Sequence, residues 1–360
     1  MKKKIVFLMY MIGNDGVTVS LLNLIEAISK NNDLDISIWS IVKSKSERKI
    51  PVEIKYLFES EKQVWEYIKN APFLIKGLEE IDIVIAYSCI FCAEILARSL
   101  IKGKKIAWIH SDLRISGKYY SNQYIKSIYE NMDEVVCVSY GVRDVLFNIM
   151  NNNYRHEKFK VIYNLINIDE ILQLAAIPID KREIENNKFV IAIGRLSLEK
   201  GFDKLIKVWK RLKEDGLDYK LIILGEGEER GNLESLIKRL NLKEECILKG
   251  YVRNPYNWIK QSELVISVSE AEGLPLNIME AMSLCKAIVA TRVMGNEELL
   301  EPELGMLVED IEDEIYKGIK KVLSSIEIKK TYIENLKRKQ PFKFEAIYVL
   351  PQIKELLEGE

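Results

Sequence analysis

The stretch LVISVSEAEGLPLNIMEAM, residues 264–282, is the most informative for the fold class. Its pattern predicts a buried strand, a turn and a helix in succession. A strand is predicted over Leu264–Val268, and Pro275 suits the first turn of the helix that follows. Short apolar runs that alternate with amphipathic segments are typical of parallel sheets with helices on both faces. Ligands of such sheets bind beyond the carboxyl ends of the strands, so the residues after each run are the candidates for function.

The same alternation runs through the whole chain and restarts once. Its 360 residues are too many for one ordinary core and suit two domains of about 150 residues. We predict doubly wound domains over 1–168 and 169–341, with a helix over 342–360 that crosses back to the first domain, and a linker within Asp169–Asn187. The predicted strands are Lys4–Met9, Ile36–Ile41, Ile83–Tyr87, Lys105–Ile109, Glu134–Val138, Lys160–Tyr163, Lys188–Gly194, Lys220–Leu224, Cys246–Leu248, Leu264–Val268 and Ala287–Ala290.

Composition excludes several classes of protein. The net charge of −1 argues against nucleic-acid binding. The apolar opening has no small-residue cleavage site after Met11, and no stretch approaches a membrane span, so we expect a cytoplasmic protein. Five cysteines give no disulfide framework. Cys89 and Cys92 form an isolated C-x-x-C, for which a redox pair or a metal pair is the alternative. We interpret them as packing residues, because a zinc site takes about four ligands and the chain has two histidines.

Residues 194–201, GRLSLEKG, follow one predicted strand and contain two cations. Arg195 leaves the strand end, and Lys200 stands just before a helix. Beside the unpaired N–H groups of a helix start, these cations would hold a pyrophosphate. The alternative is that both are solvated loop residues.

Two glutamates follow the strand Leu264–Val268. Glu280 lies in a helix that is apolar until Lys286. Burying a carboxylate there is costly unless groups such as ribose hydroxyls hydrogen-bond to it. Glu272 would reach sugar hydroxyls, and the backbone N–H groups of Gly273 and Leu274 would face the ligand. The alternatives for Glu280 are a pairing with Arg or Lys and exposure to solvent.

The first half offers a histidine and a glycine turn at strand ends. His110 follows the strand Lys105–Ile109 and is interpreted as a contact of the donor sugar or a proton carrier, with a structural role as the alternative. Gly13 and Gly16 follow the first strand and would let the backbone approach a phosphate, or serve a tight turn.

Two further motifs are rejected. Gly225-Glu226-Gly227 has its third glycine one residue late for a dinucleotide fingerprint, and its acidic neighbours would repel a pyrophosphate. Asp33-Leu34-Asp35 precedes a predicted strand, so it points away from the ligand edge. We therefore expect no metal.

The motifs GRLSLEKG at 194–201 and EGLPLNIMEAM at 272–282, with seven residues between the two glutamates, together resemble the retaining glycosyltransferases of family four. The resemblance implies the GT-B fold, two Rossmann-like domains facing a central cleft, and an activated sugar donor without metal or other cofactor. It places Arg195 and Lys200 on the leaving diphosphate, Glu280 on the ribose, Val252 at the base and Glu272 on the sugar. The implied catalytic residues are His110, Glu272, Arg195 and Lys200, and the donor-binding residues are Gly13, Gly16, Arg195, Lys200, Val252, Glu272, Gly273, Leu274, Pro275, Leu276 and Glu280.

The resemblance also implies a function. We expect a hexosyl- or N-acetylhexosaminyltransferase that moves a sugar from a UDP-sugar to a glycan or lipid-linked acceptor, with retention, in cell-surface polysaccharide or glycolipid synthesis. Residues 114–124, with Lys118, Tyr119 and Tyr120, mix cations with aromatics. They indicate contact with the inner face of the plasma membrane or with the acceptor, and the alternative is an ordinary surface helix. The alternative functions are a nucleotide-sugar epimerase and a non-catalytic glycosyltransferase partner.

Overall fold

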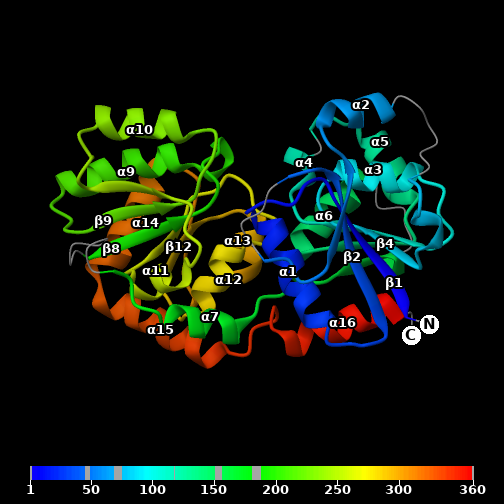
Figure 1. The fold of residues 1–360 in the computed structure, drawn as a ribbon. Helices are drawn as coiled ribbons and strands as arrows, with labels where there is room; N and C mark the ends of the chain where they lie inside the picture. Colours follow the sequence, from blue (N-terminus) through cyan, green and yellow to red (C-terminus); the bar gives the residue numbers. More distant parts are fainter. Residues whose placement is uncertain are drawn as a thin grey trace. The chain divides into compact units, whose positions relative to one another are not determined.

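The chain folds into two compact units, which the computed structural model describes for residues 2–44, 49–68, 75–116, 118–150, 156–180 and 188–358 (Figure 1). The first unit comprises Met1–Ile166 with Lys343–Glu360, and the second Asn167–Phe342. These bounds differ from the predicted domains, 1–168 and 169–341, by one or two residues. Each unit is a parallel sheet with helices on both faces, as the alternating pattern predicts.

The first unit is built on seven parallel strands in the order β3-β2-β1-β4-β5-β6-β7. The chain moves outward from β1 in one direction and returns to β4 to continue in the other, so the order reverses between these two strands. The strands are β1 Lys3–Met9, β2 Leu34–Val42, β3 Glu53–Phe58, β4 Ile83–Ala86, β5 Lys104–Ile109, β6 Glu134–Cys137 and β7 Phe159–Val161.

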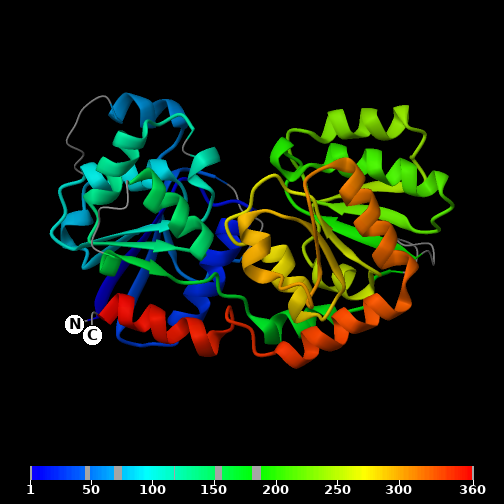
Figure 2. The ribbon, with the colours of Figure 1, turned by 180° about the vertical axis from the view of Figure 1, so that it is seen from behind.

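Helices cover both faces of this sheet. The third helix packs against the fifth and the fifth against the sixth, while the last helix of the chain packs against the first (Figures 1 and 2). Lys3 Nζ donates to the carbonyl of Leu357 at 2.6 Å, which ties the last helix to the first strand. The helices are α1 Gly16–Ile28, α2 Glu61–Ile68, α3 Ile90–Arg98, α4 Leu113–Ser116, α5 Asn122–Glu130, α6 Tyr140–Ile149 and α16 Ala346–Glu358.

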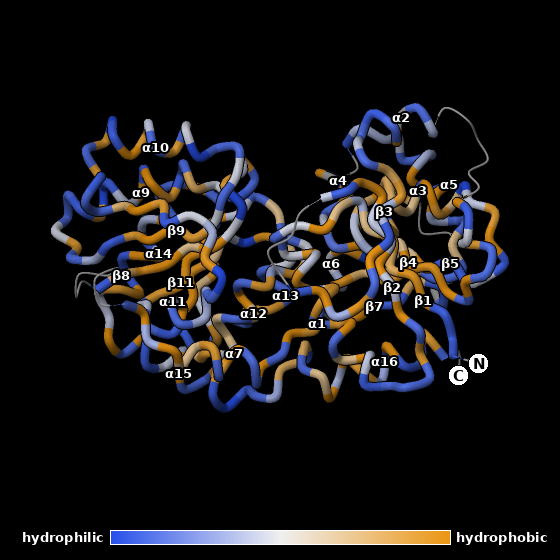
Figure 3. The backbone as a smooth tube through the Cα atoms, viewed as in Figure 1, coloured by the Kyte–Doolittle hydropathy of each residue, from blue (hydrophilic) through white to orange (hydrophobic). Residues whose placement is uncertain are grey.

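The second unit is built on six parallel strands in the order β10-β9-β8-β11-β12-β13, and its order reverses between β8 and β11. Its strands run as apolar segments inside layers of helices (Figure 3). The strands are β8 Phe189–Ile193, β9 Lys220–Leu224, β10 Cys246–Gly250, β11 Val265–Ser267, β12 Ile288–Thr291 and β13 Met306–Val308. The helices are α7 Ile168–Ala175, α9 Phe202–Glu214, α10 Arg230–Arg239, α11 Tyr256–Gln261, α12 Leu276–Ser283, α13 Met294–Leu299, α14 Glu312–Ser324 and α15 Ile326–Lys339.

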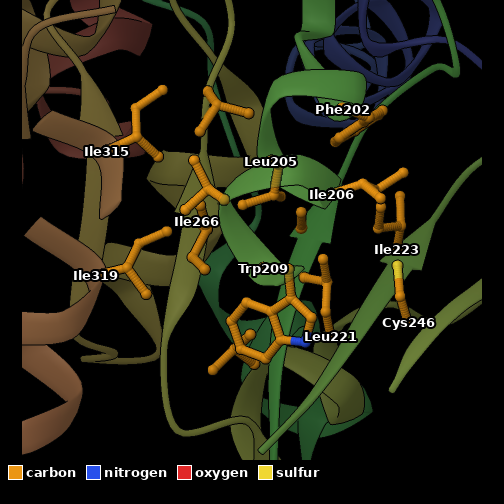
Figure 4. Close-up of a cluster of buried hydrophobic side chains, with 14 of the residues drawn as sticks. Phe202, Leu205, Ile206, Trp209, Leu221, Ile223, Cys246, Ile266, Ile315 and Ile319 are labelled. Carbon is orange, nitrogen blue, oxygen red and sulfur yellow. The ribbon is translucent and has the colours of Figure 1, made fainter. Parts of the chain in front are cut away.

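The core of the second unit is centred on α9. Phe202, Leu205 and Trp209 lie at helical spacing and point from α9 onto the strands, with Trp209 completely buried (Figure 4). The indole Nε1 of Trp209 donates to the carbonyl of Glu245 at 3.1 Å, so its one polar atom is satisfied inside the core. This packing fixes the start of α9 at the end of β8.

The sequence prediction misses two strands and misplaces the linker. The edge strands β3 and β13 lack a long apolar run. The expected linker Asp169–Asn187 overlaps α7, whose Ile171 and Ala175 are buried in the second unit, so that part of the prediction is wrong. Asn167 caps α7 by accepting from the Glu170 N–H at 3.2 Å. Residues 181–187 of the expected linker lie outside the described residues.

Candidate functional site

The candidate site lies at the carboxyl edge of the sheet in the second unit, where strand order reverses. The loop after β8 and the loop after β11 leave neighbouring strands at this point. In open parallel sheets this is the place where ligands bind. The two segments that carry the sequence motifs, 194–201 and 269–276, are these two loops.

Backbone contacts hold the two loops together. Gly201 is the N-cap residue of α9 with φ of +64°, and a Cβ at this position would lie 2.4 Å from the Val268 carbonyl. The N–H of Glu270 donates to the carbonyl of Glu199 at 2.8 Å. A side chain at Gly201 would separate the loops, so the motif glycine is required by this close approach.

Lys200 and Glu272 form an ion pair across the strand-order reversal. Lys200 Nζ lies 2.5 Å from Glu272 Oε1, and the side chains are only 21% and 11% exposed. Ser269 Oγ donates to the same oxygen at 2.7 Å. Both bonds use Oε1, and none of the described residues donates a hydrogen bond to Oε2 of Glu272.

Residues at and after the end of β12, the strand next to β11, hold the backbone around Glu272. Gly295, at the start of α13, donates its N–H to the Glu272 carbonyl at 3.1 Å. A Cβ at Gly295 would lie 2.6 Å from that oxygen. Thr291 Oγ1, at the end of β12, donates to the Ser269 carbonyl at 2.6 Å. No role was predicted for Ser269, Thr291 or Gly295, although their positions at or shortly after the ends of β11 and β12 were a usable signal.

Arg195 has a different partner from Lys200. Its NH2 group lies 3.0 Å from Glu199 Oε1, and its side chain is 60% exposed. The structure thus places both motif cations beside the end of β8 but pairs each with its own carboxylate. An exposed ion pair of this kind is weak, so Arg195 can leave Glu199 for an anionic ligand at little cost.

Glu280 is buried, at 7% exposure, in the second turn of α12. The alternative that this carboxylate faces solvent is therefore wrong. Leu274 is also buried, and Pro275 is the N-cap residue that directs the chain into α12. Asn277 Nδ2 donates to the Ile193 carbonyl at 2.9 Å, which holds the start of α12 against the end of β8.

The Gly225-Glu226-Gly227 turn has a structural role in the same edge. A Cβ on Gly225, whose φ is +143°, would lie 1.8 Å from the Gly194 carbonyl. The Leu196 N–H donates to the Glu226 carbonyl at 2.9 Å. These glycines let the loop after β9 support the loop that carries Arg195 and Lys200. Val252, the residue expected near the base, follows β10 on the same edge and is partly buried.

His110 lies at the end of β5 in the first unit, within a buried aromatic group. Its ring centroid is 4.4 Å from that of Tyr87, and its Nε2 is buried without a hydrogen-bond partner among the described residues. Burial of the ring lowers the pKa of His110 to about 3, which the hydrogen bond with the Asn164 side chain only partly opposes. The imidazole is therefore neutral near pH 7, able to donate or accept one hydrogen bond.

In the glycine turn of the first unit, the side chains of Asp15 and Thr18 accept the backbone hydrogen bonds. Asp15 caps α1 by accepting from the Thr18 N–H at 3.0 Å, and the Gly13 N–H donates to Thr18 Oγ1 at 3.1 Å. Gly16 is the first residue of α1. A phosphate at this helix start would have to share its donors with Asp15, so a phosphate contact of Gly13 and Gly16 stays a prediction.

The expected membrane segment, residues 114–124, is only partly exposed. Arg114 binds the buried carboxylate of Asp112, with NH2 2.6 Å from Oδ2. Tyr120 and Tyr124 direct their hydroxyls to Glu94, whereas Tyr119 is 86% exposed. Among the described residues, no helix is long and apolar enough to cross a bilayer, and no three or more His, Cys, Asp and Glu residues are grouped to hold a metal ion.

The comparisons with known proteins place this site in a family. Residues 176–339 match the family model for glycosyl transferases group 1. The match spans most of the second unit, Asn167–Phe342. The motif-based assignment to a glycosyltransferase with the GT-B fold is therefore confirmed. Retention of configuration and the cleft between the domains stay predictions.

Individual relatives agree with this assignment. The chain is 33% identical over 211 residues to a Campylobacter jejuni N-acetylgalactosaminyltransferase that acts on a diphospho-undecaprenol-linked saccharide, a match that covers 58% of this chain and 55% of the relative. It is 28% identical over 336 residues to an uncharacterized glycosyltransferase of Haemophilus influenzae, covering 91% and 92%. The Anabaena protein HepE, solved with UDP, shares the fold with a TM-score of 0.77 at 20% identity over 100% of both chains.

Proposed function

We propose that the chain transfers a sugar from a UDP-sugar to a hydroxyl of a glycan or lipid-linked acceptor, in cell-surface polysaccharide or glycolipid synthesis. The observation that carries the proposal is the Lys200–Glu272 pair, held by both loops at the strand-order reversal of a glycosyltransferase-family domain. The Campylobacter relative, which acts on a lipid-linked saccharide, supports such an acceptor. The two alternative functions, a nucleotide-sugar epimerase and a non-catalytic glycosyltransferase partner, are not favoured by any specific observation on the described residues.

Each residue has a role that follows from its surroundings. Lys200 and Arg195 supply positive charge at the end of β8, where the leaving diphosphate gains negative charge as the bond to the sugar breaks. Glu272 offers Oε2 to a sugar hydroxyl, while Lys200 and Ser269 fix Oε1. Glu280 is a buried carboxylate suited to ribose hydroxyls, and His110 offers its unpartnered Nε2 to the donor sugar.

The proposed stereochemistry is retention, which the resemblance of the two motifs to retaining glycosyltransferases supports. The acceptor hydroxyl attacks from the face that the diphosphate leaves, and the diphosphate takes the proton. This route retains the anomeric configuration without a covalent intermediate or a metal. A glycosylated side chain trapped during turnover would contradict it, as would loss of activity on treatment with a chelator.

The test is the dependence of nucleoside diphosphate release on the acceptor. Uridine, guanosine and adenosine diphosphate sugars are first screened by thermal shift, and the stabilising donor is then incubated with and without a lipid-linked saccharide. We expect a UDP-sugar to stabilise the protein and UDP release to require the acceptor. Interconversion of the sugar without an acceptor would indicate an epimerase, and unchanged glycan assembly in cells carrying Lys200→Ala would indicate a non-catalytic partner.

We also propose that the protein acts at the inner face of the plasma membrane. The support is the exposed pair of Lys118 and Tyr119, whose ammonium lies 5.1 Å from the ring centroid, next to Ile115, which is 41% exposed. Cations with exposed apolar side chains favour an anionic lipid surface.

A further inference from the structure

The two cysteines at the start of α3 differ sharply in their surroundings. Cys89 is the N-cap residue of α3 and is exposed, whereas Cys92 lies in the first turn and is completely buried. Their sulfur atoms lie 3.9 Å apart and are joined by a thiol hydrogen bond. The interpretation of both as packing residues therefore suits Cys92 and leaves Cys89 unexplained.

The groups around Cys89 favour its thiolate. The Cys92 thiol donates to it, and so do the N–H groups of Cys92 and Phe91 and the Ser88 hydroxyl, which together hold the pKa of Cys89 below its usual range. Burial raises the pKa of Cys92. An exposed thiolate at a helix N-terminus, backed by a buried thiol three residues later, has the features of dithiols that undergo disulfide exchange.

We propose that Cys89 and Cys92 form a reversible redox couple that reacts with low-molecular-weight disulfides. The Cys89 thiolate attacks one sulfur of the disulfide, forms a mixed disulfide and releases one small thiolate. Cys92 then gives its proton to water and attacks the Cys89 sulfur, which forms the intramolecular disulfide and releases the second thiolate. The two cysteines are oxidised by two electrons, and the small disulfide is reduced to two thiols.

The geometry permits the second step with little movement. The sulfur atoms must approach from 3.9 Å to about 2.05 Å, and Cys89 lies outside the first helical turn, where its side chain can rotate without disturbing α3. The C-x-x-C spacing is the one at which paired cysteines lower the pKa of the first. In a reducing compartment such pairs are transient and catalytic or redox-sensing.

Cys89 also lines a small cavity with His110. The cavity, of about 10 Å³, is bordered by Ser88, Cys89, His110 and Tyr129. Oxidation of Cys89 would alter a wall next to this histidine. The redox couple itself does not rest on the proposed transferase function, because its chemistry involves only the two thiols and the small disulfide.

The test compares two single variants in excess glutathione disulfide, followed by mass spectrometry of the peptide that contains both cysteines. The unaltered protein should lose two hydrogens and recover them with dithiothreitol. C92S should gain one glutathione on Cys89, at least about tenfold faster than C89S gains one on Cys92, because only Cys89 combines exposure with thiolate character. Equal rates in the two variants would overturn the proposal.

A second measurement uses the unaltered protein and so does not depend on how the variants fold. Limited alkylation with iodoacetamide should label Cys89 before Cys137 and Cys246, which are buried, and before the partly buried Cys285. Preferential labelling of Cys285, or a peptide that keeps both hydrogens in excess glutathione disulfide, would contradict the redox couple.

Discussion

At the scale of the residue, the protein orients the carboxylate of Glu272 through one oxygen, and the proposed function assigns the other oxygen to a ligand. Oε1 accepts from Lys200 at 2.5 Å and from Ser269 at 2.7 Å, which orients the group. A hydrogen bond between Oε2 and a sugar hydroxyl would then form without reorganisation of the side chain. Loss of the charge should therefore affect turnover more than folding.

Glu272→Gln keeps the shape of the side chain and removes its charge. We expect kcat/KM to fall by about tenfold to a hundredfold, since hydrogen bonds to charged groups contribute roughly 1.5–3 kcal/mol. Glu270→Gln is the matched control, because Glu270 stands two residues away and pairs with Lys204 on the exposed side. Equal losses in the two variants, measured by initial rates of UDP release, would show that Glu272 has no specific role.

The pH dependence of stability should carry the signature of His110. Its pKa in the folded protein is about 3, below the usual value of about 6.5, so the unfolded chain binds the proton more tightly. The stabilisation is complete above pH 6.5 and is lost as the pH falls from there toward 3. Urea unfolding at pH 7.5 and pH 5 should show a larger loss of unfolding free energy for the unaltered protein than for His110→Gln; parallel losses would contradict this assignment.

At the scale of the element, the strand-end loops of the second unit depend on close backbone contact. Gly225→Ala would place a Cβ 1.8 Å from the Gly194 carbonyl at a φ that only glycine adopts readily. We expect a loss on the order of 3 kcal/mol in unfolding free energy, from combined backbone strain and overpacking. Gly231→Ala, in α10 with open space around it, should be neutral or slightly stabilising. Similar urea midpoints for the two variants would contradict the packing argument.

Apolar runs were enough to predict the central strands. The prediction of Lys220–Leu224 matches β9 in both bounds, and α9 follows Gly201 as its helical spacing indicates. The edge strand β3 was missed because its exposed side chains include Glu53 and Lys55, which break the apolar run. The helix α7 was missed because charges outweighed its short apolar stripe.

The site was predictable in its residues but not in its pairings. The rule that ligands bind at strand ends, together with the family motifs, pointed to Lys200, Glu272 and Glu280. The pairing of Arg195 with Glu199 and the contacts of Ser269 and Gly295 with Glu272 were not predicted. The first two depend on the conformation of a single loop, and the contact of Gly295 joins the loops after two different strands.

At the scale of the whole molecule, the last helix belongs to the first unit although it follows the second in sequence. Val349, Ile353 and Leu356 of α16 are buried, and Lys160 pairs with Glu355 at 3.0 Å. Deletion of residues 343–360 should therefore lower the thermal transition of the first unit and leave that of the second unchanged. Calorimetry would contradict this if the deletion shifted both transitions equally.

The proposed membrane contact involves one surface of the first unit. Tyr119→Ala should weaken binding to liposomes that contain anionic lipid, because this side chain is 86% exposed. Tyr120→Phe is the control, since Tyr120 is half-buried and directs its hydroxyl to Glu94. Unchanged co-sedimentation of Tyr119→Ala with the liposomes would remove the support for this contact.

The central claim is that the strand-order reversal of the second unit binds a nucleoside diphosphate through Lys200. Isothermal titration calorimetry of UDP tests it most directly, with Lys200→Met compared with Lys207→Met, a lysine of α9 that pairs with the exposed Asp203. We expect UDP to bind the unaltered protein and Lys207→Met alike, and to bind Lys200→Met at least about tenfold more weakly. Equal UDP affinity in all three proteins, or no binding to the unaltered protein, would contradict it.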